Sequence, residues 1–151
     1  MSLQTPLSIA VAGAGYIGQA HINAILSTPG FRLTAIVDPS EAGQAVANKT
    51  GVQHFESLDA LLSHNTPDAV VLATPNALHV TQALQCAKAG VAILLEKPVA
   101  ITAAEGDRLL TGLGAHAERV LVGHHRAHSS IMRAATACIG SGDLGRLVCV
   151  T

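Results

Sequence analysis

Short apolar segments alternate along the chain with longer segments of helical character. In Ala69–Leu72 and Val91–Leu95 the apolar residues follow one another directly, which is typical of strands that are covered on both faces. This alternation predicts repeated βαβ units around a parallel sheet. We expect strands at Leu7–Ala12, Leu33–Val37, Val52–Phe55, Ala69–Ala73, Val91–Leu95 and Arg119–Gly123.

Helices are expected in the gaps between these strands. Helices on both faces of an open parallel sheet give an α/β, doubly wound Rossmann fold with strand order 3-2-1-4-5-6. No internal repeat or low-complexity segment interrupts the pattern. The expected helices are Ile17–Ser27, Glu41–Lys49, Leu58–Ser63, Ala77–Ala89, Ala103–Gly114 and Ser130–Ile139.

The end of the chain departs from this pattern. Residues 140–145 have the composition of a loop, and Arg146–Thr151 resembles the start of a new apolar strand. We therefore expect a dinucleotide-binding domain at residues 1–145. Residues 146–151 are interpreted as the first strand of a further α/β domain, the rest of which is missing.

Composition limits the classes of partner. The 151 residues are 49% hydrophobic, which suffices for the core of one domain, and the net charge of −1 comes with no basic run that could follow a nucleic-acid backbone. No apolar stretch approaches the ~18 residues of a membrane span, and no signal peptide is recognisable. Three cysteines without C-x-x-C spacing indicate a reducing compartment. We expect a cytoplasmic protein that binds neither nucleic acid nor membrane.

The segment after the first predicted strand carries the pattern G-x-G-x-x-G. Gly13 permits a tight turn, Gly15 lets the backbone approach a pyrophosphate, and Gly18 lets the following helix pack closely on the strand. Tyr16 and Ile17, which lie inside the motif, are further candidate cofactor contacts. By itself the motif fits a flexible glycine turn equally well.

Asp38 supports the dinucleotide interpretation. It ends the second predicted strand, twenty residues after Gly18, where a carboxylate accepts hydrogen bonds from a ribose. A carboxylate repels a 2′-phosphate, and neither Pro39 nor Ser40 supplies the arginine that NADP favours, so NAD is expected rather than NADP. The alternative is that Asp38 is only a turn residue before Pro39.

Polar residues follow the last three predicted strands. Ligands of open α/β sheets bind beyond the carboxyl ends of the strands, and these residues are therefore candidates for the site. They are Thr74, Asn76 and His79 after the fourth strand, Glu96, Lys97 and Pro98 after the fifth, and His124, His125, Arg126 and His128 after the sixth.

With these motifs the whole chain resembles the Gfo/Idh/MocA family of oxidoreductases, which includes glucose-fructose oxidoreductases and inositol dehydrogenases. The resemblance rests on Gly13–Gly18 with His21, on Asp38, on Ala73–Asn76 with His79, and above all on Glu96-Lys97-Pro98. It implies a hydride transfer between NAD and a sugar, a cyclitol or a related alcohol. Relatives are about twice as long, have a second α/β domain that supplies substrate-binding residues, and form homo-oligomers through that domain.

The resemblance also implies roles for individual residues. Lys97 would be the catalytic residue beside the reacting oxygen, where a cationic amine stabilises developing negative charge or relays the hydroxyl proton. Glu96 and Pro98 would shape the nicotinamide pocket. The cofactor groove would be lined by Thr74, Asn76 and His79, and His125 and Arg126 would border the substrate.

Bland alternatives remain for several of these residues. Lys97 could be an exposed loop lysine, and Asn76 could simply cap a helix. The three histidines at 124, 125 and 128 could belong to a solvated loop or to a metal site, although no Cys or acid lies nearby at a ligand spacing, and no metal is expected.

Two other functions compete with the oxidoreductase. A stand-alone nucleotide-binding module would explain the length but leaves Glu96-Lys97-Pro98 unexplained. An S-adenosylmethionine methyltransferase also uses a glycine loop, but it needs an antiparallel pair of last strands and usually an acid where this chain has Val11 and Ala12. For the oxidoreductase, we expect this chain alone to bind the cofactor weakly with little or no turnover.

Overall fold

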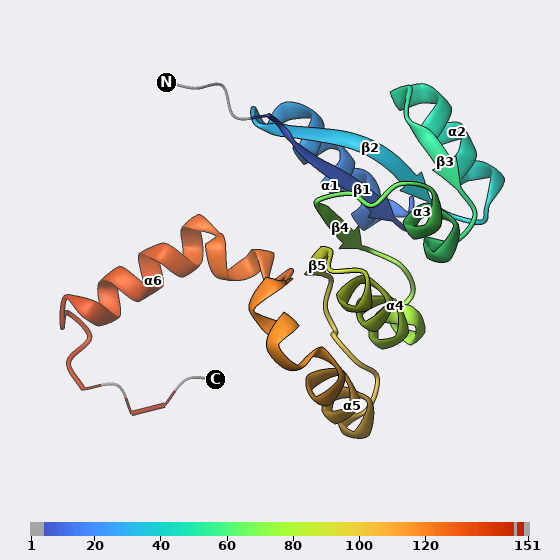
Figure 1. Cartoon of the computed structure of the whole chain (residues 1–151). Coiled ribbons are helices and arrows are strands. Elements are labelled where there is room, and N and C mark those ends of the chain that lie inside the picture. The colour runs from blue at the N-terminus through green and yellow to red at the C-terminus, as the bar shows by residue number, and fades with distance from the viewer. Residues whose placement is uncertain (1–4, 147, 150–151) are drawn as a thin grey trace.

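The computed structural model describes residues 5–146, 148 and 149 of the chain. Six parallel strands form one sheet in the order β3-β2-β1-β4-β5-β6, which confirms the predicted doubly wound topology (Figure 1). The strands are β1 (Leu7–Ala12), β2 (Phe31–Val37), β3 (Gln53–Phe55), β4 (Ala69–Leu72), β5 (Ala92–Leu95) and β6 (Val120–Val122).

All the predicted helices are present, and their ends differ from the expected ones by at most about one residue. Several begin after a serine or threonine whose hydroxyl accepts a hydrogen bond from a backbone N–H in the first turn, as Ser40 does from Gly43 and Thr102 from Glu105. The helices are α1 (Tyr16–Ser27), α2 (Glu41–Thr50), α3 (Leu58–His64), α4 (Asn76–Lys88), α5 (Ala103–Leu113) and α6 (Ser130–Gly140).

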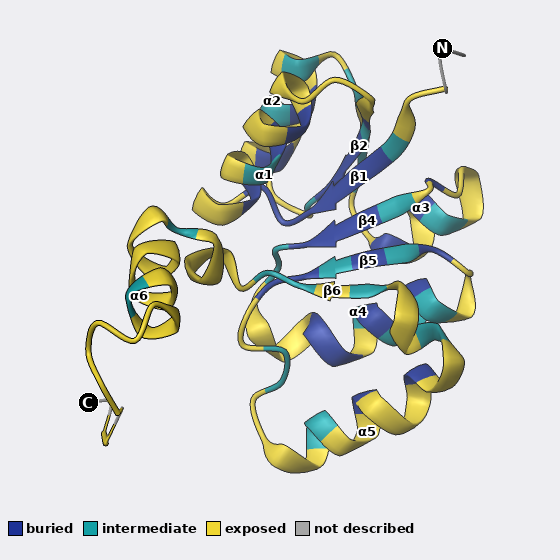
Figure 2. Cartoon of the chain, turned by 90° about the vertical axis from the view of Figure 1, so that its left-hand side faces the viewer, coloured by how far each residue is buried: buried dark blue, intermediate teal, exposed yellow. Residues whose placement is uncertain are grey.

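The sheet separates two hydrophobic layers. Along β1, Ile9 and Val11 face the layer that α1 and α2 complete, whereas Ala10 and Ala12 face the layer of α3, α4 and α5. Burial on both faces explains why the central strands are apolar on consecutive residues. Figure 2 shows β1 and β4 at the buried centre of the molecule, whereas β6 at the edge of the sheet is half-buried or exposed.

Most strand ends lie within one residue of the predicted ends, and two differences from the sequence prediction are larger. β2 begins at Phe31 instead of Leu33, because Phe31 and Arg32 pair with Leu7 and Ser8 of β1 although Arg32 interrupts the apolar run. Two 3-10 helices, Gly114–Arg119 and His125–His128, were not predicted. Such short turns carry no periodic apolar pattern in the sequence.

The C-terminal helix projects away from the sheet, as Figures 1 and 2 show. Apart from the half-buried Cys138, every residue of α6 is exposed. Val148 and Cys149 have no regular structure, and the other residues of the predicted strand after Arg146 lie outside the described part of the chain. The division into residues 1–145 and 146–151 therefore stays a prediction. In the described residues, no helix has the length and apolar character needed to cross a bilayer.

Candidate functional site

The register of the sheet brings the candidate residues to one edge. Ala12 of β1 pairs with Leu72 of β4, Leu72 with Leu95 of β5, and Leu95 with Val122 of β6. The segments that follow these four residues therefore leave the sheet side by side. They are the glycine loop, the Thr74 loop, the Glu96–Pro98 segment and the histidine-rich segment.

The three glycines of the loop differ in what surrounds them. Gly13 has a φ of +90°, and a Cβ built there would lie 2.4 Å from the carbonyl oxygen of Ala73. A Cβ on Gly18 would lie 1.8 Å from the carbonyl oxygen of Gly13, whereas a Cβ on Gly15 would meet nothing within 4 Å. Gly13 and Gly18 are thus required by packing, and Gly15 leaves open space in which a ligand can approach the backbone.

The amino end of α1 is suited to an anion. Gly15 is its N-cap, no side chain caps the helix, and no acidic residue lies in its first turn. Its first backbone N–H groups therefore have no side-chain acceptor and lie at the positive end of the helix dipole. Tyr16 is 88% exposed and Ile17 40% exposed at this end, so both side chains are accessible to a bound molecule.

Asp38 is held firmly beside the glycine loop. Its Oδ2 accepts a hydrogen bond from the Ala14 N–H at 2.8 Å, and its Oδ1 accepts hydrogen bonds from the N–H and hydroxyl of Ser40 at 2.9 and 2.5 Å. Partial burial raises the pKa of Asp38, but these hydrogen bonds and the nearby His54 outweigh it, and the net pKa lies below its ordinary value. Asp38 is therefore a fixed carboxylate at neutral pH.

A groove of about 480 Å³ runs past Asp38 between the start of α3 and α4, and it reaches Gly13 of the glycine loop. Gly43, which was missed from the sequence, leaves room for Asp38: a Cβ on Gly43 would lie 2.3 Å from the Asp38 Cβ. A glycine weakens a helix, so its presence in the first turn of α2 was a sign in the sequence that this position is tightly packed. The groove is lined by Gly13, Val37, Asp38, Pro39, Glu56, Ser57, Leu58, Asp59, Thr74, Pro75, Leu78, Thr81, Gln82 and Gln85.

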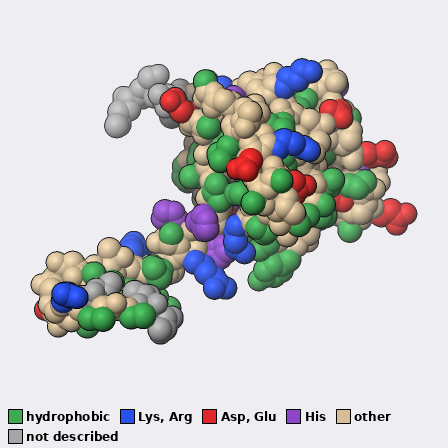
Figure 3. Space-filling view, turned by 90° about the horizontal axis from the view of Figure 1, so that it is seen from below, with side chains coloured by type: hydrophobic (Ala, Val, Ile, Leu, Met, Phe, Trp, Pro, Cys, Tyr) green, Lys and Arg blue, Asp and Glu red, His purple; other side chains and the backbone are tan. Residues whose placement is uncertain are grey.

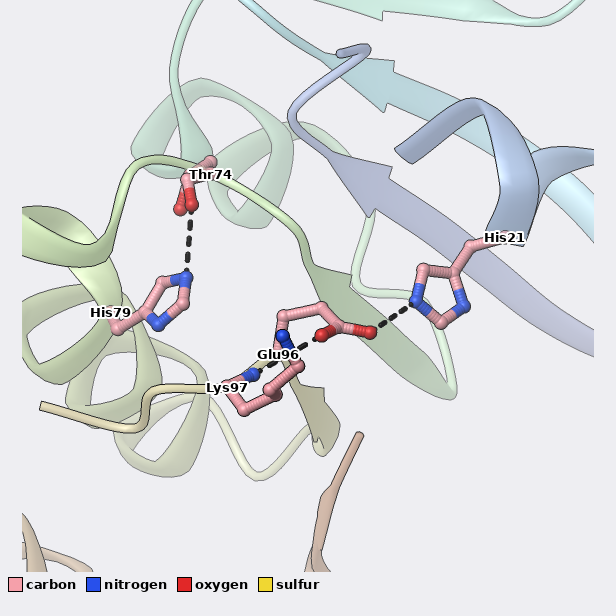
Figure 4. Close-up of polar contacts among 5 residues, drawn as sticks. All are labelled: His21, Thr74, His79, Glu96 and Lys97. Atoms are coloured by element: carbon pink, nitrogen blue, oxygen red, sulfur yellow. Dashed lines mark hydrogen bonds and ion pairs between the residues drawn. The ribbon is translucent and has the colours of Figure 1, made fainter. Parts of the chain in front are cut away.

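Glu96 is buried and paired with a histidine from another element. Its Oε1 lies 2.8 Å from Nε2 of His21 on α1, and its Oε2 accepts a hydrogen bond from the Lys97 N–H at 3.2 Å (Figure 4). Burial raises the pKa of Glu96, but the hydrogen bonds from His21 and Lys97 and the electrostatic influence of His21 and His125 bring it below its ordinary value. Glu96 thus joins α1 to the end of β5 and holds the backbone of Lys97.

Gly123 completes this arrangement. A Cβ at this position would lie 2.7 Å from Glu96 Oε1, so any other residue here would force the carboxylate to shift. The Gly123 N–H also donates to the Leu95 carbonyl at 2.8 Å, which continues the pairing of β5 and β6. The sequence predicts only that Gly123 ends a strand, because nothing in its local pattern indicates the contact with Glu96.

His79 is 1% exposed and lies between two loops. Its Nε2 is 2.9 Å from the Thr74 carbonyl and its Nδ1 is 2.8 Å from the Pro98 carbonyl. The peptide bond between Lys97 and Pro98 is cis. A small pocket of about 100 Å³ lies here, lined by Ile17, Ala73, Thr74, Asn76, His79, Glu96 and Lys97.

The remaining candidates lie around this pocket and at the end of β6. Asn76 is the first residue of α4, but the N-cap is Pro75 and no side chain caps the helix, so the capping alternative for Asn76 is wrong. Lys97 and Pro98 are both exposed, and Lys97 lines the pocket. His125 and Arg126 are exposed in the 3-10 helix after β6, and His125 is close enough to Glu96 for its charge to lower the Glu96 pKa.

Figure 3 shows histidine and basic side chains gathered where the projecting C-terminal segment meets the body of the molecule. The sequence that leads from β6 into α6 contains three histidines and one arginine, namely His124, His125, Arg126 and His128. Within the described part of the chain, no three His, Cys, Asp or Glu side chains come together as metal ligands would.

The lowered pKa values of Asp38 and Glu96 predict how stability depends on pH. A carboxyl group whose pKa is lower in the folded than in the unfolded chain stabilises the folded state at neutral pH, and this contribution is lost as the pH falls. The loss should start as the pH falls through the ordinary values of 4.5 for Glu96 and 3.8 for Asp38. Urea unfolding at a series of pH values measures it.

Matched variants assign this pH dependence to the two carboxylates. Asp38→Asn and Glu96→Gln should each lower stability at neutral pH and flatten its fall towards acidic pH, because the neutral amide cannot gain a proton in this range. An unchanged slope in both variants would contradict the assignment.

A model of an oxidoreductase family with an NAD-binding Rossmann fold, Gfo/Idh/MocA, matches residues 7–124. Among curated relatives, the inositol 2-dehydrogenase of Leifsonia xyli subsp. xyli is 35% identical over 98% of this chain and 44% of its own length. The 2,7-anhydro-N-acetylneuraminate hydratase of Mediterraneibacter gnavus is 30% identical over 92% of this chain and 37% of its own length. The chain therefore spans less than half of the relatives that it matches.

Two solved structures also match this chain over less than half of their own length. The WlbA dehydrogenase of Bordetella pertussis, in complex with NADH and UDP-GlcNAcA, superimposes with a TM-score of 0.86 at 31% identity, over 97% of this chain and 43% of that chain. A myo-inositol 2-dehydrogenase from Lactobacillus plantarum superimposes with a TM-score of 0.89 over 95% of this chain and 43% of that chain. At 22% identity, the second likeness establishes the fold alone.

Proposed function

Because the chain belongs to the Gfo/Idh/MocA family of oxidoreductases with an NAD-binding Rossmann fold, we propose that it supplies the cofactor site and the catalytic lysine of a dehydrogenase. The reaction would transfer a hydride between NAD(H) and a sugar, a cyclitol or a related alcohol. The chain covers only part of its relatives, so we propose that a second domain provides the other wall of the substrate site.

One observation carries this proposal: the parts that a nicotinamide dehydrogenase requires lie along one edge of the sheet. Asp38 and the glycine loop lie at the ends of β2 and β1, and Lys97 follows β5, beyond the intervening β4. A dinucleotide laid along this edge would have its ribose at Asp38, its pyrophosphate at the amino end of α1, and its nicotinamide towards Lys97.

The residues at the end of β5 are suited to moving a proton during a hydride transfer. NAD accepts the hydride when it is bound. The Lys97 amine would lie beside the reacting oxygen and stabilise its negative charge or take its proton. Glu96, fixed by His21, would keep the Lys97 backbone in one position, and orientation of this kind contributes strongly to catalysis.

The similar proteins support a class of substrate, without identifying a single compound. Among the similar proteins, one is an inositol 2-dehydrogenase and another is a dehydrogenase in complex with UDP-GlcNAcA, which supports a substrate of the polyol or sugar class. We propose that His125 and Arg126, exposed after β6, border this substrate. Oligomerisation through a second domain and a cytoplasmic location belong to the same proposal.

The competing functions account for less of the molecule. A stand-alone nucleotide-binding module gives no reason for the buried Glu96 that holds Lys97. A methyltransferase fold needs an antiparallel pair of last strands, and among the described residues β5 and β6 pair in parallel.

Calorimetric titration of the purified chain with NAD, NADH, NADP and S-adenosylmethionine tests the cofactor assignment. We expect NAD and NADH to bind, and Asp38→Ala to lower the affinity for NAD about tenfold or more, because a charged acceptor on the ribose hydroxyls is lost. The variant should also narrow the preference for NAD over NADP, because the repulsion of the 2′-phosphate disappears.

Ser57→Ala is the matched control, because Ser57 lines the same groove but its hydroxyl accepts the N–H of Ala60. Its preference for NAD over NADP should match that of the unmodified chain. Binding of S-adenosylmethionine in place of NAD would contradict the proposed function.

A further inference from the structure

We propose that His79 is a positioning residue that clamps the Lys97–Pro98 segment to the loop after β4, and that this clamp fixes the nicotinamide end of the site. The inference rests on the proposed function, since it concerns the residue next to the proposed catalytic lysine. It adds a role to that function, because His79 would act through the backbone of two loops, in addition to any direct contact with the cofactor.

The clamp spans two segments that are distant in the sequence. Nε2 of the ring reaches the carbonyl of Thr74, the second residue after β4, and Nδ1 reaches the carbonyl of Pro98, directly after Lys97. His79 itself lies on α4, which packs against both β4 and β5. The ring therefore bridges the two strand ends between which the small pocket lies.

Both contacts of His79 depend on hydrogen atoms on its ring nitrogens. Carbonyl oxygens only accept hydrogen bonds, so each contact needs an N–H from the imidazole. A neutral ring donates one of these bonds and a protonated ring donates both. The His79 side chain is 1% exposed, so bulk water does not reach its ring nitrogens as a substitute partner.

The Lys97–Pro98 segment has few other anchors. The Lys97 N–H donates to Glu96 Oε2 at 3.2 Å, and Pro98 has no N–H to donate. Within the described residues, the Pro98 carbonyl has its hydrogen-bond contact with Nδ1 of His79. Loss of the imidazole N–H groups should therefore release the segment that carries Lys97. The backbone hydrogen bonds that pair β4 with β5 should be unaffected.

The test compares two variants of the same chain. His79→Phe keeps a flat ring of similar size but has no hydrogen-bond donor, whereas His79→Gln has a smaller side chain that keeps an amide donor. The first readout is amide hydrogen exchange measured by NMR at Lys97 and Leu78, with the amides of β4 and β5 as internal references. Leu78 is informative because its N–H donates to the Pro75 carbonyl in the clamped loop.

The second readout is the affinity for NADH compared with that for ADP-ribose, which lacks the nicotinamide. In His79→Phe, we expect exchange at Lys97 and Leu78 to accelerate about tenfold or more while β4 and β5 are unchanged, because one or two buried hydrogen bonds are lost. The affinity for NADH should fall about tenfold, and the affinity for ADP-ribose should stay the same. His79→Gln should recover part of both effects.

The outcomes separate the clamp from a general structural role and from the proposed function. Unchanged exchange at Lys97 and Leu78 in His79→Phe, or equal acceleration throughout the sheet, would overturn the clamp. An equal loss of affinity for NADH and ADP-ribose would overturn its link to the nicotinamide end. If the unmodified chain binds neither ligand, the proposed function fails, while the exchange readout still decides whether His79 holds the two loops.

Discussion

Gly18→Ala is expected to destabilise the chain by more than about 3 kcal/mol and to abolish NAD binding. The new Cβ would lie 1.8 Å from the Gly13 carbonyl oxygen and 2.9 Å from its carbonyl carbon. Both atoms belong to the backbone, so a rotamer change cannot relieve the contact. Either α1 or the turn at Gly13 must move, and the turn already lies against Ala73 of the next loop.

A second glycine provides the matched control. Gly106 lies inside α5, and a Cβ built there would meet nothing within 4 Å. Gly106→Ala should therefore stabilise the chain by about 0.5–1 kcal/mol, because alanine loses less backbone entropy on folding into a helix. Urea unfolding of both variants, together with calorimetric titration with NADH, measures the difference. Equal stabilities of the two variants would show that the close packing of α1 on the glycine loop is not required.

Lys97→Met is expected to lower kcat by about 10²–10⁴-fold in an enzyme that contains this site, with little change in NADH affinity. Methionine has a similar length but cannot stabilise charge or move a proton. Because this chain covers 44% of the Leifsonia xyli inositol 2-dehydrogenase, the measurement uses a chimera in which the chain replaces the matching residues of that enzyme. NADH formation with inositol then gives kcat.

The chimera needs two controls. Lys88→Met removes another exposed lysine, at the end of α4 and outside the lining of the pocket, and should leave kcat unchanged. Titration of NADH into each variant verifies that the cofactor site remains intact. A Lys97→Met chimera as active as the Lys88→Met chimera would remove Lys97 from the proposed mechanism.

Much of the fold is local in origin and was therefore predictable. The apolar runs of β4 and β5 require cover on both faces, and in the sheet they are packed from both sides. The glycine loop and Asp38 were also recognisable, because a strand, a turn and a helix in succession fix their relative positions at short sequence distance. The edge at which the polar residues gather follows from the parallel direction of the strands.

Only the tertiary structure assigned partners to these residues. His21 and Glu96 are 75 positions apart, yet their side chains lie 2.8 Å apart, and Gly123 leaves the space that Glu96 occupies. His79 had been recognised as a candidate groove residue, but its two carbonyl partners come from loops that meet only when β4 and β5 pair.

This division follows from the distance along the sequence over which each kind of interaction acts. The sequence by itself determined which segments become strands and helices, and where a phosphate loop and a ribose acid lie, because backbone geometry and apolar periodicity act over a few residues. Packing decided the contacts of Glu96, His79 and Gly43, because each depends on how closely separate elements approach, and no local pattern encodes that distance.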